Sequence, residues 1–238
     1  MIRINGINKT YGNLKVLNDI NLNWNKGQCV GLLGSNGSGK TTLIKILLGL
    51  VVPDKGEVFV GKQNIKHGSS YRNIMGYMPQ IGRYPENMNI LQLFDLMKDI
   101  RGKGEGELDR ALYFEYRLDE LGQKLLGSLS GGTRQKVSAA IAFLFDPEVI
   151  ILDEPTAGLD PLAALQLKRK IEDYILKGKL VIITSHILSE LEALVTDVVF
   201  LQDGEVFFNG NKEELFRSTQ QNSLNEAIAL LMKNGIAC

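Results

Sequence analysis

A glycine-rich segment constrains the fold of this chain more than any other part of its sequence. It reads Gly34-Ser35-Asn36-Gly37-Ser38-Gly39-Lys40-Thr41 and lies between an apolar run at 29–33 and a helix-like run that starts at Thr42. The order strand, glycine-rich loop and helix is the context in which the pattern G-x-x-x-x-G-K-[ST] binds phosphate. Glycines let successive backbone N–H groups point at an anion, and the positive end of the following helix adds to the field. We therefore expect residues 34–42 to bind the phosphates of a nucleotide.

Two side chains at the end of this loop have separate expected roles. Lys40 would bridge the β- and γ-phosphates, and Thr41 supplies a hydroxyl suited to Mg²⁺, a hard cation that prefers oxygen ligands. The alternative is an ordinary glycine-rich turn between a strand and a helix. It is disfavoured because the pattern is complete and correctly placed.

Composition and charge limit the classes to which the chain can belong. At 238 residues it can form one large domain or two lobes that share a core. Lys plus Arg and Asp plus Glu number 27 each, so no overall field attracts nucleic acid or acidic lipid, and nucleic-acid binding is not implied. The two cysteines, Cys29 and Cys238, indicate neither a disulfide framework nor a metal site, which fits a reducing compartment.

The sequence contains no recognisable targeting or membrane-spanning segment. The run from Met1 to Gly6 alternates like a strand and lacks the apolar core of a signal peptide. No uninterrupted apolar run approaches the roughly 20 residues that cross a bilayer. If the protein acts at a membrane, we expect other chains to span it.

Two kinds of apolar pattern predict an α/β fold. Residues 2–24 alternate with period two around a turn at 11–13, which favours an N-terminal antiparallel β layer. Continuous apolar runs indicate strands buried in a mainly parallel sheet, and helical runs between them complete βαβ units. The strand runs are 149–152, 180–184 and 198–201, and the helical runs are 162–176 and 187–195.

The region between residues 81 and 146 changes character, because apolar residues recur there at helical spacing. Asn89 with Gln92 is a plausible start of its first helix, and further helical stretches are expected at 108–117 and 120–126. Two short helices should finish the chain, with start signals at Asn211 with Glu214 and at Ser223 with Glu226. The expected organisation is a core of residues 1–80 and 147–210, an inserted helical lobe of residues 81–146, and C-terminal helices in residues 211–238.

Polar side chains follow several of the predicted strands, at the sheet edge where ligands of α/β proteins bind. Asp153 suits Mg²⁺ coordination, and Glu154 suits a general base for an attacking water. His186 is placed to sense a γ-phosphate, and Gln80 could reach the metal or the water, a role that spacing alone leaves open. The alternatives are solvated caps for the acidic pair and an ordinary surface or core position for the histidine.

A second anion-binding surface is predicted far from the first in sequence. Leu129 is followed by Ser130-Gly131-Gly132-Thr133, which opens a helix that runs from residue 134 to about residue 145. Exposed N–H groups, a hydroxyl and the helix dipole all favour an anion there. One nucleotide on one phosphate-binding loop does not obviously need this second surface.

Taken together, these motifs resemble the nucleotide-binding subunit of ABC transporters over essentially the whole chain. Tyr11 matches the adenine-stacking aromatic of that family, although a loop tyrosine alone is more often a packing residue. Six further motifs match in order and spacing. They are the phosphate-binding loop 34–41, the loop at Gln80, the signature 129–133, the Walker B run that ends at Asp153-Glu154, Leu159-Asp160 as the D-loop, and His186 as the switch histidine.

The resemblance implies an ATPase that uses ATP and Mg²⁺ in a head-to-tail dimer. Each ATP would be held by the phosphate-binding loop of one subunit and the signature of the other, with a second copy of this chain as the expected partner. Asp160 would pass between the two sites. Gln80 and the helical lobe would face integral-membrane permease subunits, at the cytoplasmic face of the cell membrane. Thr133 stands where the signature usually has glutamine, so we expect activity with altered packing at that helix start.

Two other functions stay open at this point. One is a soluble ABC-type ATPase that acts on DNA or ribosomes, although neither a long coiled-coil insertion nor a second cassette is visible. The other is a protein that senses ATP without hydrolysing it. Residues 76–80 and 84–87 are similar to ATPases that serve ABC-2-type permeases, including the copper-related system that matures nitrous-oxide reductase. The transported substrate and the direction of transport are not encoded in this chain.

Overall fold

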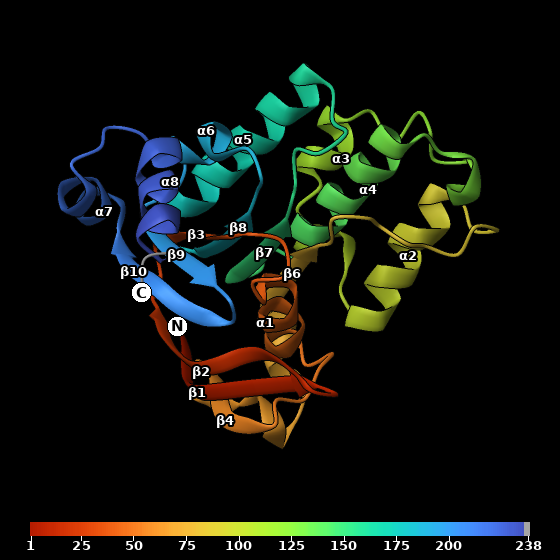
Figure 1. Ribbon diagram of the computed structural model, residues 1–238. Helices are drawn as coiled ribbons and strands as arrows, with labels where there is room; N and C mark the ends of the chain where they lie inside the picture. The colour runs from red at the N-terminus through yellow and green to blue at the C-terminus, as the bar shows by residue number, and fades with distance from the viewer. Residues whose placement is uncertain (236–238) are drawn as a thin grey trace. The chain divides into compact units, whose positions relative to one another are not determined.

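The computed structural model describes residues 1–235, and Cys238 lies outside the described residues (Figure 1). The chain divides into two compact units. The first consists of Met1–Arg72 and Leu180–Cys238, and the second of Asn73–Lys179. Both contain parallel strands and helices, which confirms the predicted α/β class. No helix within residues 1–235 is long and apolar enough to cross a membrane.

The first unit begins with an antiparallel sheet in the strand order β2-β1-β4-β5. Alternate side chains of β1 and β2, among them Ile2, Ile4 and Leu22, are buried, because one face of the sheet packs against the core. This confirms the predicted period-two layer. The strands are β1 (Ile2–Tyr11), β2 (Leu14–Trp24), β4 (Lys55–Val60) and β5 (Gln63–Asn64).

A second sheet in the same unit has the strand order β10-β9-β3-β8. Strand β3 runs parallel to β8 and β9, and β10 closes the edge as an antiparallel partner of β9. Each of β3, β8 and β9 is a nearly continuous buried run, as expected for strands covered on both faces. Their bounds are β3 (Cys29–Gly34), β8 (Leu180–Thr184), β9 (Asp197–Gln202) and β10 (Glu205–Asn211).

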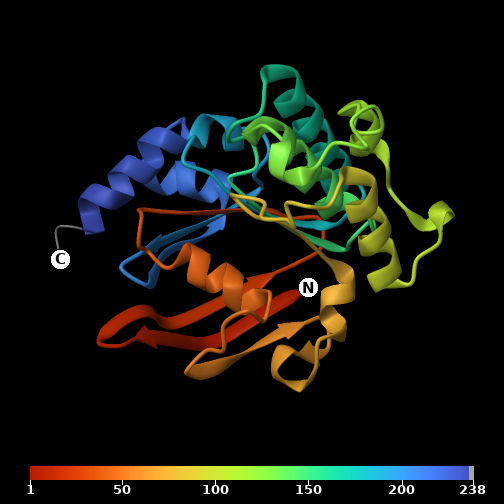
Figure 2. The ribbon, with the colours of Figure 1, turned by 90° about the vertical axis from the view of Figure 1, so that its right-hand side faces the viewer.

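Helix α1 (Lys40–Leu47) contacts both β2 and β3, and so packs between the two sheets of the first unit (Figure 2). Its buried side chains Leu43, Ile44, Ile46 and Leu47 fill that space. The helix ends at Leu47 because Gly49, two residues later, adopts a left-handed conformation (φ 68°), a common helix stop.

The three remaining helices of the first unit follow β8 and β10. Helix α8 packs against α6 and α7, which belong to the same unit. Ser223 and Glu226 form the predicted start of α8, whereas Asn211 caps α7 through the N–H of Glu213 instead of pairing with Glu214. The bounds are α6 (Leu188–Glu192), shorter than the predicted 187–195, α7 (Lys212–Thr219) and α8 (Leu224–Gly235).

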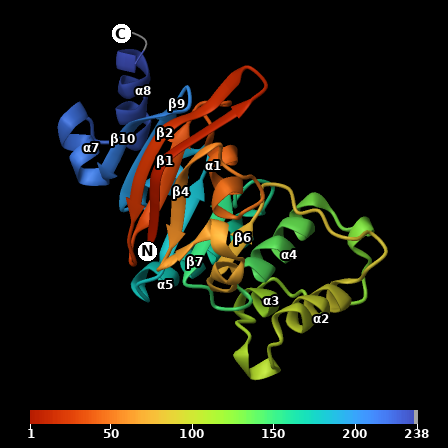
Figure 3. The ribbon, with the colours of Figure 1, turned by 90° about the horizontal axis from the view of Figure 1, so that it is seen from below.

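The second unit combines a parallel strand pair, β6 and β7, with four α-helices. Helices α3 and α4 pack against each other, α3 also contacts α5, and α4 contacts β6 (Figure 3). The capping box predicted for Asn89 and Gln92 is present at the start of α2. The bounds are β6 (Met75–Met78), β7 (Val149–Asp153), α2 (Ile90–Arg101), α3 (Ala111–Glu115), α4 (Gly131–Phe143) and α5 (Pro161–Leu176).

Four short 3-10 helices complete the described elements, and one of them replaces a predicted α-helix. The stretch at 120–126 was expected to be helical, which is wrong: it forms turns that end in a 3-10 helix. The backbone N–H of Leu91 donates to the carbonyl of Gly122, so pairing with the start of α2 overrides the local helical spacing. The 3-10 helices are Ile65–His67, Ser70–Ile74, Glu105–Glu107 and Leu126–Ser128.

Candidate nucleotide site and signature segment

Three glycines fix the shape of the loop between β3 and α1. Gly34, Gly37 and Gly39 have φ angles of 149°, 83° and 102°, which side chains rarely tolerate. A Cβ atom on Gly34 would lie 2.2 Å from the carbonyl oxygen of Leu201, and one on Gly39 would lie 2.6 Å from a methyl carbon of Leu17. The loop therefore has both the conformation and the close packing that only glycine allows.

Two polar side chains of this loop are oriented by the loop itself. The Lys40 ammonium donates to the carbonyl oxygens of Gly34 and Ser35, at 2.7 and 2.9 Å, so its side chain folds back over the loop. The Ser38 hydroxyl is 2% exposed and has no hydrogen-bond partner within the described residues. A buried hydroxyl without a partner is costly, so this loop fits an additional acceptor group such as a phosphate.

Thr41 and Asp153, two of the side chains expected to hold Mg²⁺, each offer an oxygen of the kind that this cation prefers. Thr41 is exposed at the start of α1, and Asp153 is half-buried at the end of β7. Within residues 1–235 no group of three His, Cys, Asp or Glu side chains could hold a metal ion. Mg²⁺ does not require such a cluster, because it usually combines one or two protein oxygens with phosphate oxygens and water.

His186 and the phosphate-binding loop follow adjacent parallel strands of the first unit. In the β3–β8 ladder Cys29 pairs with Val181 and Gly31 with Ile183, so both strands end at the same edge. Thr184 and Ser185 are buried, and the Ser185 hydroxyl accepts from the N–H of Ile187 at 2.9 Å, which shapes the turn that presents an exposed His186. This edge is the ligand-binding edge of parallel sheets.

Tyr11 lies at the end of β1, where the hairpin to β2 turns. Its side chain is 48% exposed, and the Lys9 ammonium lies 5.4 Å from the ring centroid. The ring is thus not a core packing residue. An exposed aromatic face of this kind is available for stacking on a base.

The second unit brings Gln80 and the acidic pair to one end of its strand pair. In the β6–β7 ladder Met78 pairs with Leu152, and Gln80 and Glu154 follow these residues by the same number of positions. Glu154 is 9% exposed and has a positive φ of 52°, which is unusual for a residue with a side chain. Glu154 thus places a buried carboxylate just beyond the carboxyl end of a parallel strand, the edge at which ligands of α/β sheets bind.

The signature segment forms the start of α4. Ser130 is its N-cap: the hydroxyl accepts from the N–H of Thr133 at 3.2 Å and lies 2.9 Å from the Thr133 hydroxyl. Gly131 faces open space, whereas a Cβ atom on Gly132 would lie 2.8 Å from the carbonyl oxygen of Gly158. Thr133 stands where the signature usually has glutamine, and through its N–H and hydroxyl contacts it holds the Ser130 side chain at the start of the helix.

Asp160 is held by contacts within its own unit. One carboxylate oxygen accepts from the N–H of Ala163 at 3.0 Å and caps α5, and the other lies 2.6 Å from the ammonium of Lys136. The hydrogen bond from Lys136 is the main cause that lowers the pKa of Asp160. Sequence reasoning did not single out Lys136, because a lysine six positions after Ser130 is an ordinary helix-surface residue by pattern alone.

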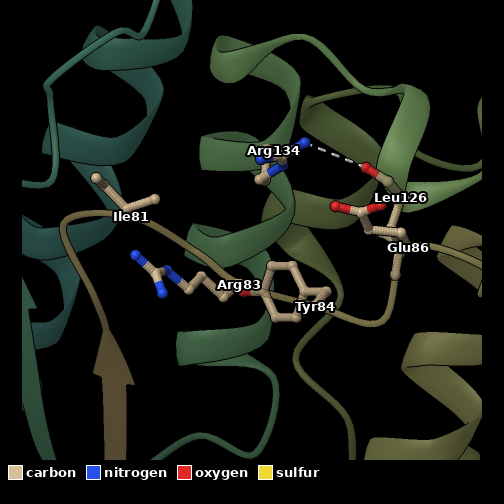
Figure 4. Close-up of a pocket in the computed structure, with 6 residues that line it drawn as sticks. All are labelled: Ile81, Arg83, Tyr84, Glu86, Leu126 and Arg134. Atoms are coloured by element: carbon tan, nitrogen blue, oxygen red, sulfur yellow. Dashed lines mark hydrogen bonds between the residues drawn. The ribbon is translucent and has the colours of Figure 1, made fainter.

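A pocket of about 440 Å³ opens in the second unit, close to the loop that follows Gln80 (Figure 4). Ile81 is 64% exposed there, burial raises the pKa of Tyr84, and Arg134 donates to the carbonyl of Leu126. The pocket thus combines apolar and cationic groups. It is lined by Ile81, Arg83, Tyr84, Glu86, Leu126 and Arg134, of which Arg83 and Arg134 were not predicted as site residues.

A glycine-shaped loop at the carboxyl edge of parallel strands, with its lysine folded over it, defines a P-loop nucleotide-binding protein. Comparison with known proteins narrows this class. The family model described as "ABC transporter" matches residues 17–157. The lipopolysaccharide export system ATP-binding protein LptB of Escherichia coli (strain K12) is 34% identical over 88% of this chain and 90% of its own length. The Nod factor export ATP-binding protein I of Cupriavidus pinatubonensis is 30% identical over 92% of this chain and 68% of its own length.

Comparison with solved structures leads to the same family. A structure described as the ATP binding subunit of an ABC transporter is 29% identical, with a TM-score of 0.92 over 98% of this chain and 99% of that chain. A dimeric bacterial ABC transporter cassette, 24% identical with a TM-score of 0.77, covers 89% of this chain and 98% of that one and shares the fold. The chain belongs to the ABC transporter family. Within that family it is an ATP-binding subunit, and its activity is that of an ATPase.

Proposed function

We propose that this subunit hydrolyses Mg-ATP as a head-to-tail dimer at the cytoplasmic face of the membrane and thereby drives conformational change in a permease. The observation that carries the proposal is the presence of two anion-binding segments in one chain: the glycine-shaped loop 34–41 and the signature segment 130–133. In a symmetric head-to-tail dimer, the loop of one subunit and the signature segment of the other form one composite site, and the site occurs twice. A solved cassette of the same fold is a dimer, which supports this arrangement.

The phosphate-binding loop would hold ATP through its backbone N–H groups, the Lys40 ammonium and the Ser38 hydroxyl. Lys40 is already directed at the loop by its two carbonyl contacts, so it can move to phosphate oxygens with little loss of side-chain entropy. Thr41, Asp153 and Gln80 are the side chains that would hold Mg²⁺. Mg²⁺, when bound, neutralises phosphate charge. Tyr11 would stack on the adenine.

Glu154 is assigned as the general base for the attacking water. A carboxylate can accept a proton from water once the water is oriented, and the buried position of Glu154 restricts its side chain to few orientations. His186 would sense the γ-phosphate at the edge of the first unit, and Gln80 would orient the water or the metal from the loop after β6. Residues Ser130, Gly131 and Gly132 would complete the site from the partner subunit.

The central experiment replaces Glu154 with Gln, which keeps size and hydrogen bonding but removes the base. We expect ATP hydrolysis to fall by about 10²–10⁴-fold and a stable ATP-bound dimer to accumulate, measured by phosphate release and by analytical ultracentrifugation. Glu172→Gln, on the exposed surface of α5, is the matched control and should keep wild-type turnover. Unchanged turnover in the Glu154→Gln variant would refute the role assigned to Glu154.

The permease would dock at the pocket in the second unit. Ile81 offers exposed apolar surface beside the half-buried Tyr84, and Arg83 offers an exposed cationic group. The relatives LptB and Nod factor export ATP-binding protein I are named for export, which supports a transporter subunit over an ATPase that acts on DNA or ribosomes.

Docking has its own test. Arg83→Glu reverses the charge of the pocket, so we expect it to reduce co-purification with the membrane protein encoded beside this chain's gene while ATP binding stays unchanged. Lys124→Glu, at an exposed position of the same unit outside the pocket lining, is the control. Capture of nucleic acid or ribosomes instead of a membrane protein would favour the alternative function. The identity of the captured permease would also decide whether the ABC-2 subgroup is correct.

A further inference from the structure

The signature helix and the start of α5 are joined by an ion pair within the second unit. The Lys136 ammonium lies 2.6 Å from Asp160, and Lys136 is about one quarter exposed whereas Asp160 is half exposed. The other carboxylate oxygen of Asp160 caps α5 at Ala163. Both oxygens of this carboxylate are therefore used inside the subunit.

A second contact joins the same two segments. The carbonyl oxygen of Gly158 approaches Gly132 so closely that a Cβ atom there would lie 2.8 Å from it. Residues 132 and 136 are separated by four positions, so they lie on one face of α4, one turn apart. Residues 158–160 are thus held against that face at two points.

Tyr116 contacts both Ala163 of α5 and Lys136 of α4, and so supports the same arrangement. Its hydroxyl donates to the carbonyl of Ala163 at 3.2 Å, and the Lys136 ammonium lies 5.9 Å from its ring centroid. The buried ring therefore fixes the first turn of α5 and limits the positions that the lysine can take. We refer to the Lys136–Asp160 pair and the Gly132–Gly158 approach together as the α4–α5 contact.

We propose that Lys136 is a positioning residue: through the α4–α5 contact it makes the signature segment 130–133 and residues 158–160, which contain the D-loop, move as a single element within one subunit. This inference rests on the proposed function, in which both segments face the partner subunit. When Ser130 to Gly132 engage a nucleotide held by the partner, the contact fixes where residues 158–160 lie against that partner. The D-loop then acts through its position, because its carboxylate is already engaged within the subunit.

The test is a double-mutant cycle on ATP turnover. Lys136→Met keeps length but removes the charge, and Asp160→Asn removes the charge while keeping a good N-cap residue. We expect each single variant to lower kcat about three- to tenfold and to reduce the Hill coefficient for ATP, and the double variant to be no worse than either single one. Lys136→Arg keeps the positive charge, so kcat and the Hill coefficient should both stay close to their wild-type values. A purely structural role would leave the Hill coefficient unchanged.

Two controls separate this inference from stability and from the proposed function. Melting temperatures of the variants should stay close to wild type, because ion pairs whose side chains remain partly exposed to water contribute little to stability. Lys177→Met breaks a comparable pair with Asp173 on α5 and should leave kcat unchanged. Wild-type kcat in Lys136→Met, multiplicative losses in the double variant, or failure of Lys136→Arg to restore activity would overturn the inference. If Glu154→Gln still gives an ATP-bound dimer in that case, the proposed function stands and only the role of Lys136 is rejected.

Discussion

The two anion-binding segments of this molecule are built in different ways. The loop 34–41 depends on glycines with positive φ angles and on a buried hydroxyl. It also depends on a lysine whose ammonium donates to backbone carbonyls of the same loop. The signature segment 130–133 is a regular helix start, with an N-cap serine and an open glycine at position 131. The first is a loop whose glycines allow its backbone to wrap around a phosphate, whereas the second is an exposed helix start that can only complete a site formed elsewhere.

This difference assigns separate tasks to the two segments. A loop whose backbone is already fixed by its glycines can bind nucleotide within a single subunit, because binding has little conformational entropy to remove. An exposed helix start contributes a few N–H groups and a dipole, which are worth little alone in water. We therefore expect loop variants to change nucleotide affinity of the monomer and signature variants to change ATP-dependent dimerisation only.

The largest expected effect on nucleotide binding comes from the loop lysine. Lys40→Ala removes a charge-assisted contact to phosphate, so affinity for Mg-ATP should fall by about 10- to 100-fold. Lys45→Ala, at an exposed position further along α1, removes the same charge outside the loop and should bind normally. Titration with a fluorescent ATP analogue measures both. Normal affinity in Lys40→Ala would contradict the assignment of the loop.

The second prediction compares one glycine from each segment. Gly34→Ala forces a Cβ atom onto a backbone carbonyl and onto the Ser38 hydroxyl, so we expect a loss of about 2–4 kcal/mol in unfolding free energy. Gly131→Ala meets no atom within 4 Å and sits in a helix, so unfolding should change by no more than about 0.5 kcal/mol. Urea denaturation measures the difference. Equal stability of the two variants would show that the loop is not constrained as the structure indicates.

The smallest effect concerns Thr133, where this chain departs from the usual signature. Thr133→Val keeps the shape and the backbone N–H but removes the hydroxyl that lies 2.9 Å from the Ser130 hydroxyl. One hydrogen bond of this kind contributes about 0.5–1.5 kcal/mol, so ATP-dependent dimerisation should weaken about two- to tenfold. Thr133→Ser keeps the hydroxyl and should remain close to wild type. Sedimentation of both variants in the Glu154→Gln background gives the comparison.

Local patterns predicted most elements correctly, and the one predicted helix that is absent has a tertiary cause. The capping box at Asn89, the strands 180–184 and 198–201, and the antiparallel layer depend on short-range spacing, and the structure contains them. The predicted helix at 120–126 is absent because its backbone pairs with the start of α2 instead. That pairing joins residues about 30 positions apart in the sequence, so a pattern of neighbouring residues cannot predict it.

The candidate site shows the same division between local and tertiary information. Glycines, a lysine and a threonine in fixed order determine a phosphate-binding loop, because the loop is a local structure whose backbone angles follow from its own residues. The ion pair between Lys136 and Asp160 and the pocket beside Tyr84 join residues from separate elements. The sequence by itself therefore determined the α/β class and the phosphate-binding loop. Only the tertiary structure decided that the signature helix holds the D-loop within the same unit, because that contact exists only after α4 and α5 have packed.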